Sequence, residues 1–142
     1  MSSLTYAEAN DEMLAVVKSA FDSLSGSPNI YWESVAGDRA TNDEPFFQVF
    51  LRHRTGGQAG FPSATGAAMY RREGDITIQC FHPIGRGLSS AYADAKVFSD
   101  AFEGKSTSGG IWFRNVRINE IGRDGQFNQL NLIVEFVYDE IK

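Results

Sequence analysis

Apolar residues recur at helical spacing in two segments of the chain. In the first segment they stand three or four positions apart, at Leu14, Val17, Phe21 and Leu24. This spacing predicts the apolar stripe of an amphipathic helix. The helix would open near Thr5, and residues 25–28, which include a glycine and a proline, would end it.

The second helical segment begins after a turn that contains Pro83. Ser89 or Ser90 can cap it with a hydroxyl group, and Gly104 is placed to end it. Its predicted stripe consists of Ala91, Ala95, Phe98 and Phe102.

Alternating apolar and polar residues predict strands in four other segments. These segments are 46–52, 75–82, 111–121 and 127–138, and residues 29–32 form either a short strand or an extended lead-in. An Asp-Gly pair at 124–125 predicts a hairpin between the last two strands. Because the final strand is apolar on both faces, we expect it in the middle of the sheet. We therefore predict one α+β domain over 1–142, with a mainly antiparallel sheet of about four strands and two helices on one face.

Residues 54–70 show no regular hydrophobic period. Small residues dominate this stretch, so it cannot repay the entropy of becoming ordered by its own contacts. We expect a flexible loop here. Two interpretations stay open: a simple hairpin connection, or a binding arm that becomes ordered on a partner.

Composition and charge narrow the class of protein. The chain has 142 residues, of which 42% are hydrophobic and eleven are phenylalanine, enough for a well-filled core. Its net charge of −5 disfavours nucleic-acid binding, which usually needs a basic face. The apolar runs are too short to span a membrane, and the first residues lack the pattern of a signal peptide. We therefore expect assembly in the cytoplasm and no membrane partner.

Cys80 and His82 are the first candidates for chemistry. They share one strand face with Ile76 and Ile78, so the predicted role of Cys80 is a buried core residue rather than a nucleophile. One cysteine and two histidines exclude a multi-cysteine or histidine-rich metal site. The glycines at 85 and 87 lack the last glycine of a dinucleotide fingerprint. We expect no enzyme activity, no cofactor and no metal.

Several blocks of sequence resemble a phage protein family. They are Asn-Ile-Tyr-Trp-Glu at 29–33, Glu-Pro-Phe-Phe-Gln-Val at 44–49, the run 71–79, the run Phe-His-Pro-Ile-Gly-Arg-Gly at 81–87, Ala91 and Ala95, Phe-Glu-Gly at 102–104, and the closing run 134–139. In this order they resemble the tail-terminator-like proteins of long-tailed bacteriophages and prophages, over nearly the whole chain.

The resemblance implies a structural protein of the virion tail, assembled in the bacterial host. Such proteins form a six-fold ring that caps the growing tail tube, stops polymerisation and presents a surface to the head connector. The implied partners are other copies of the chain, the tube protein and the head-completion protein, and DNA would pass through the ring. Alternatives are another head–tail connector, a tail-tube subunit or, less favoured, a small enzyme using Cys80 and His82.

A ring subunit needs contact surfaces for its neighbours. Phe46 and Phe50 make the second face of their strand only partly polar, so we expect another surface to cover it. The loop 54–70 carries an apolar Phe61-Pro62 pair at its tip, and Arg54, Arg71 and Arg72 place positive charge where the loop joins the strands. The candidate interface residues are therefore Phe46, Phe50, Arg54, Phe61, Arg71 and Arg72.

Overall fold

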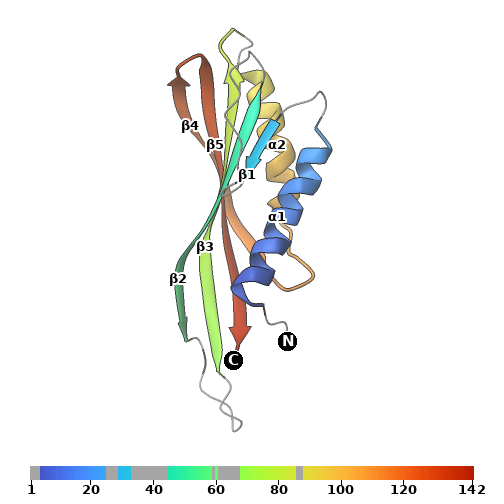
Figure 1. The fold of residues 1–142 in the computed structure, drawn as a ribbon, viewed down its shortest axis with the longest axis vertical. Helices are drawn as coiled ribbons and strands as arrows, with labels where there is room; N and C mark the ends of the chain where they lie inside the picture. The colour runs from blue at the N-terminus through green and yellow to red at the C-terminus, as the bar shows by residue number, and fades with distance from the viewer. Residues whose placement is uncertain (1–3, 25–28, 33–44, 59, 61–67, 86–87) are drawn as a thin grey trace.

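Two helices cover one face of a five-stranded sheet in the computed structural model, which describes residues 4–24, 29–32, 45–58, 60, 68–85 and 88–142 (Figure 1). The elements follow in the order α1 (Tyr6–Asp22), β1 (Asn29–Trp32), β2 (Phe46–Gln58), β3 (Met69–Pro83), α2 (Ser89–Phe102), β4 (Trp112–Asp124) and β5 (Phe127–Ile141). The predicted α+β class and the helix layer on one face are confirmed.

The strands lie in the order β1-β2-β3-β5-β4. β1 is parallel to β2, and every other neighbouring pair is antiparallel. The sheet has five strands rather than about four because residues 29–32 pair with the start of β2. β5 lies between β3 and β4, so the last strand is an interior strand, as predicted, although β3 occupies the middle of the five.

α1 begins where the sequence predicts. The Thr5 hydroxyl accepts the Glu8 backbone N–H at 3.2 Å, and the Glu8 carboxylate accepts the Thr5 N–H at 3.1 Å. This reciprocal pair satisfies two backbone donors that a helix start leaves without partners. The most deeply buried stripe is slightly rotated from the predicted one, and consists of Ala9, Met13, Val17 and Ala20.

α2 confirms the predicted stripe but not the predicted cap. All four stripe residues, Ala91, Ala95, Phe98 and Phe102, are completely buried. The cap position belongs to Leu88, whose carbonyl accepts the Tyr92 N–H at 2.9 Å and whose side chain makes no capping bond. Ser89 is already inside the helix, so the hydroxyl cap was wrong. Gly104 follows the helix with φ +71°, a left-handed conformation that glycine adopts without strain.

The main core lies between the sheet and the helices. Helix residues such as Phe98 pack against strand residues such as Phe47, whose rings are 5.3 Å apart. β3 and β5 supply the centre of this layer through alternate inward-facing residues, all buried: Ile76, Ile78, Cys80, Leu130, Leu132, Val134 and Phe136.

The β2–β3 hairpin is longer than the sequence predicts. β2 continues to Gln58, and β3 begins at Met69, so the predicted loop 54–70 is wrong at both ends. The cause lies on the other side of β3, where β5 pairs with it up to Ile141 and Ala68 exchanges backbone hydrogen bonds of 2.8 and 3.0 Å with Lys142. Residues 59 and 61–67, which include Phe61, lie outside the described residues. Figure 1 shows β2 and β3 reaching past the N-terminal end of α1.

Candidate interaction surface

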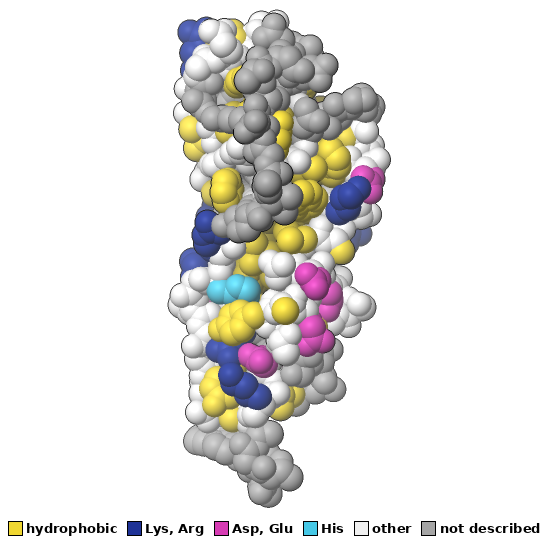
Figure 2. Space-filling model, viewed as in Figure 1, with side chains coloured by type: hydrophobic (Ala, Val, Ile, Leu, Met, Phe, Trp, Pro, Cys, Tyr) yellow, Lys and Arg dark blue, Asp and Glu magenta, His cyan; other side chains and the backbone are white. Residues whose placement is uncertain are grey.

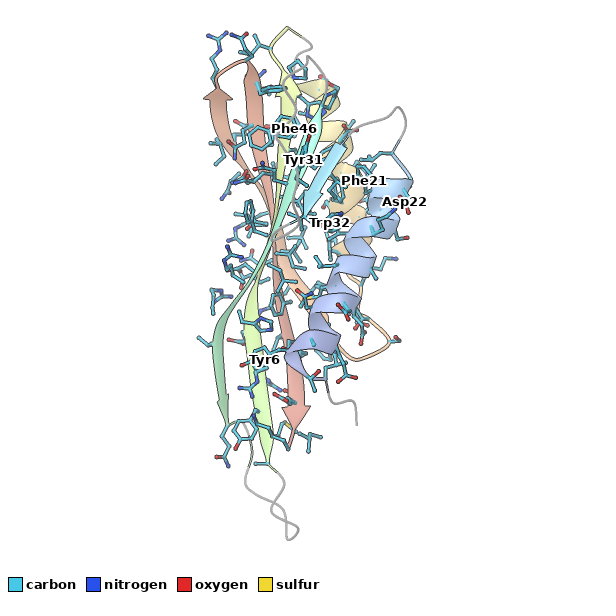
Figure 3. The ribbon with its side chains drawn as sticks, viewed as in Figure 1. Tyr6, Phe21, Asp22, Tyr31, Trp32 and Phe46 are labelled. Atoms are coloured by element: carbon cyan, nitrogen blue, oxygen red, sulfur yellow. The ribbon has the colours of Figure 1, made fainter. Side chains whose placement is uncertain are left out.

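The face of the sheet opposite the helices, here called the outer face, has an aromatic part near β1. Phe46 stacks on Phe81 at 4.5 Å between ring centroids and meets Phe127 edge-on at 5.0 Å. Tyr31 of β1 adds a second edge-on contact at 5.8 Å, and Figure 3 shows it beside Phe46. Phe46 is 0% exposed. Phe46 therefore has almost no surface left for a neighbouring subunit in the single chain, and its role at an interface stays a prediction.

A row of charged side chains crosses the outer face farther along the strands. Asp75 of β3 lies opposite Glu135 of β5, which lies opposite Arg114 of β4. Arg54 of β2 donates to Asp75 at 2.7 Å, and Arg117 of β4 donates to Glu135 at 3.2 Å. Asp75 and Glu135 are like charges on neighbouring strands, an unfavourable pair in a sheet. Arg54 offsets their repulsion, because it also lies 3.8 Å from the Glu135 carboxylate. Through these contacts the row links all four long strands.

Glu135 is the centre of this row. The Asn115 amide donates to its carboxylate, which lowers the pKa of Glu135, and the charges of Arg117, Arg54 and Arg114 lower it further. Asn115 lies at a register shift in β4 and has φ 53°, a conformation that asparagine tolerates better than most residues. The irregularity in β4 thus places an amide donor on the carboxylate.

Next to the charged row lies a pocket of about 260 Å³, called here the Trp112 pocket. Two ion pairs border it, Arg71 with Asp139 at 3.1 Å and Arg114 with Glu73 at 3.2 Å. The Trp112 side chain is 68% exposed. The lining residues are Arg71, Glu73, Gly110, Trp112, Arg114, Val137, Tyr138 and Asp139.

Arg72 points to the opposite face from its neighbour Arg71. It is 6% exposed and donates to the Glu140 carboxylate from two nitrogens, at 2.8 and 3.2 Å. Its guanidinium carbon lies 5.0 Å from the Tyr6 ring centroid and 5.2 Å from that of Tyr70. The hydrogen bonds to Glu140 raise the pKa of Arg72. Arg72 is therefore engaged within its own domain, and its predicted role at an interface stays a prediction.

His53 and Tyr138 complete the group around Arg72. The His53 Nε2 and the Tyr138 hydroxyl are 2.7 Å apart, and Tyr6 meets the His53 ring edge-on at 4.6 Å. Burial lowers the pKa of His53, and the positive charge of Arg72 lowers it further. Burial also raises the pKa of Tyr138 to about 12. Figure 3 shows Tyr6 at the start of α1, so this group joins the helix to the sheet.

Cys80 and His82 lie under α2. The Cys80 side chain is completely buried, and burial raises the pKa of its thiol, as does the nearby charge of Asp94. A protonated, enclosed thiol is a poor nucleophile. His82 is 1% exposed and its Nε2 lies 2.9 Å from the Asp94 carboxylate, so it joins β3 to α2. These contacts favour the structural interpretation of both residues.

The candidate interface residues thus differ in how exposed they are. Arg54 and Arg71 are exposed on the outer face, Phe50 is half-buried, and Phe46 and Arg72 are buried. The sequence reasoning missed Trp112, although Ile111 and Phe113 face the core on either side of it. The alternation of buried and exposed residues could have placed Trp112 outside.

Other kinds of site find little support in the described part of the chain. No group of three or more His, Cys, Asp or Glu residues there could hold a metal ion. Within the same residues, neither helix is long and apolar enough to cross a membrane.

Comparison with known proteins supports the fold and gives no information on activity. No protein-family model matches the sequence, and no curated protein matches it. The fold is similar to that of a solved structure whose name states no function, with a TM-score of 0.59, 12% sequence identity, and coverage of 91% of this chain and 95% of that chain. An identity this low shows a shared fold alone. The chain is therefore an open-sheet α+β domain whose exposed outer face is its candidate interaction surface.

Proposed function

We propose that the chain is a structural subunit of a bacteriophage tail, which assembles into a ring that caps the tail tube. The observation that carries this proposal is the β2–β3 hairpin, which extends past the helix layer (Figure 1). Every β2 residue from position 54 to 58 is exposed, so the β2 side of this end of the hairpin has little cover from its own domain. Strands that extend beyond their own core are suited to contact a neighbouring subunit. The sequence blocks that resemble tail terminators support the same role.

A closed ring requires two different patches on each subunit, because one patch meets the other on the next copy. The chain offers two such patches: the far end of the β2–β3 hairpin, and the Trp112 pocket, which β3, β5 and the edge strand β4 form together. Trp and Arg, the residue types of the second patch, are enriched among the residues that dominate binding energy.

Charge is distributed unevenly between the two layers. α1 and α2 carry six carboxylates and two lysines: Glu8, Asp11, Glu12, Asp22, Asp94, Asp100, Lys18 and Lys96. Figure 2 shows acidic side chains gathered over α1, while basic side chains lie mainly on the strand side. An acidic layer that faces the lumen would let DNA pass without binding. The proposed partners are therefore neighbouring copies, the tube protein and the head connector.

Oligomeric state tests this proposal directly. Light scattering after size exclusion, over a range of concentrations, should find a monomer or weak oligomer when dilute and larger species when concentrated. Electron microscopy with tail tubes of the same phage should show one ring at the tube end. A chain that stays monomeric even on tubes would overturn the ring. Stacks of rings would indicate a tube subunit instead, and a two-fold dimer alone would count against both roles.

A further inference from the structure

We infer that the Trp112 pocket of one copy binds the hairpin tip of a second copy, residues 60–68, through its Phe61-Pro62 pair. This inference rests on the proposed ring, since it names the contact that joins neighbouring subunits. The pocket consists of described residues only, and the tip is identified by its sequence and by where its two ends leave the sheet.

The Trp112 side chain lies outside the core of this domain. Ile111 is 0% exposed and Phe113 is 8% exposed, so the residues on either side supply the core contacts of this segment. Trp112 at 68% exposure lines the pocket together with Arg71 and Arg114, whose side chains are both more than half exposed. An exposed tryptophan beside two arginines has the composition of a binding hot spot.

The charges around the pocket favour a neutral guest. Arg71 is paired with Asp139 and Arg114 with Glu73, so the four charged residues sum to zero. A charged guest would lose its hydration without meeting a surplus of opposite charge. The remaining surface is the indole of Trp112 and the aliphatic side chain of Val137, which suit an aromatic or proline side chain.

The size of the pocket favours a side chain over a small molecule. Its volume of about 260 Å³ is below the roughly 300–1,000 Å³ of typical small-molecule sites. One aromatic ring with an adjacent proline is a guest of suitable size.

The hairpin tip is the segment of this chain that fits these requirements. Residues 60–68 contain no charged side chain, and Phe61 and Pro62 are the only large apolar residues among them. The tip leaves the sheet at its far end, where Ala68 pairs with Lys142 at the end of the chain. The tip is therefore placed to contact a neighbour.

Peptide binding tests the pocket without requiring a ring. A synthetic peptide of residues 57–68 is titrated into the ¹⁵N-labelled full chain, and the Trp112 indole resonance is followed, with assignment through a Trp112→Phe variant. We expect a saturable shift, and binding at least tenfold weaker for a peptide with Phe61→Ala. No shift, or equal binding of both peptides, would overturn the inference.

A photocrosslinker identifies the partner in the assembled state. The chain with p-benzoylphenylalanine at position 61 is mixed with a longer, tagged copy and irradiated under conditions that give oligomers. Crosslinks from the tip to the tagged copy at the peptide containing Trp112 support the inference. Crosslinks within one chain alone, or to another surface, contradict it.

Matched variants separate this inference from the proposed function. Trp112→Ala should weaken self-association at least tenfold, whereas Ile121→Ala, which alters another exposed residue of β4, should leave it unchanged. Both side chains are exposed, so both variants should keep the thermal midpoint of the parent. If rings form on tubes and Trp112→Ala has no effect, this contact is wrong while the ring stands. If peptides bind but no ring forms on tubes, the pocket stands and the tail function fails.

Discussion

At Gly74 the sheet depends on the absence of a side chain. A Cβ atom at this position would lie 2.0 Å from the Arg52 carbonyl oxygen and 2.6 Å from the Phe136 ring. Gly74 pairs with His53 immediately before the β2 irregularity at Arg54, so the two backbones approach closely there. Glycine permits this approach, and any larger residue forces the strands apart.

We predict that Gly74→Ala lowers the free energy of unfolding by about 1–3 kcal/mol, the usual cost of overpacking a tight site. Urea denaturation followed by circular dichroism measures this change. Gly57→Ala is the control, because an added Cβ there meets no atom within 4 Å. Equal stability of the two variants would show that β2 and β3 separate easily at Gly74.

Single residues were predictable from the sequence where a local rule decides their environment. The α2 stripe follows from helical spacing, and the burial of Cys80 follows from alternation along β3. The contact at Gly74 could not be predicted, because it depends on the register of three strands. The Trp112 pocket could not be predicted for the same reason, because its lining residues come from β3, β4 and β5.

Among the elements, the Arg72–Glu140 pair holds together the far end of the sheet. It joins β3 to β5, and its contact with Tyr6 adds the start of α1. The side chains of Arg72 and Glu140 are only 8% and 12% exposed, so each needs the other as a partner. This pair also explains why β3 begins at Met69, where the local composition predicts a loop. The stabilising contacts come from β5, about 70 residues away in sequence.

We predict that Arg72→Met destabilises the protein by about 3 kcal/mol, because it leaves the Glu140 carboxylate enclosed without its cation. The double variant Arg72→Met/Glu140→Leu should recover most of this loss. Arg71→Met is the matched control, since the exposed Arg71–Asp139 pair contributes at most about 1 kcal/mol. Thermal and urea unfolding measure all three variants. A double variant as unstable as the single one would contradict the role of the ion pair.

At the scale of the whole molecule, the two faces of the sheet have different tasks. The inner face and the helices form the core, and the outer face carries the charged row and the Trp112 pocket. This division was predictable from helical and strand periodicity, because both are local patterns. The lengths of β2 and β3 and the charged row were not, because they depend on pairing between distant strands. The ring itself remains a proposal drawn from the extended hairpin and the sequence resemblance.

Adjacent residues of β5 test the division between the two faces. Val134 is 0% exposed and faces the helices, whereas Ile133 is half-buried on the outer face. We predict that Val134→Asp unfolds the domain, because an unpaired charge in the core costs several kcal/mol. Ile133→Asp should fold, because the new carboxylate would be in contact with water and position 133 pairs with Arg117 of the neighbouring strand β4. Near-ultraviolet circular dichroism and size exclusion compare the two variants. A folded Val134→Asp protein that only fails to assemble would mean that Val134 faces a subunit interface, and that the helices do not cover this face of β5.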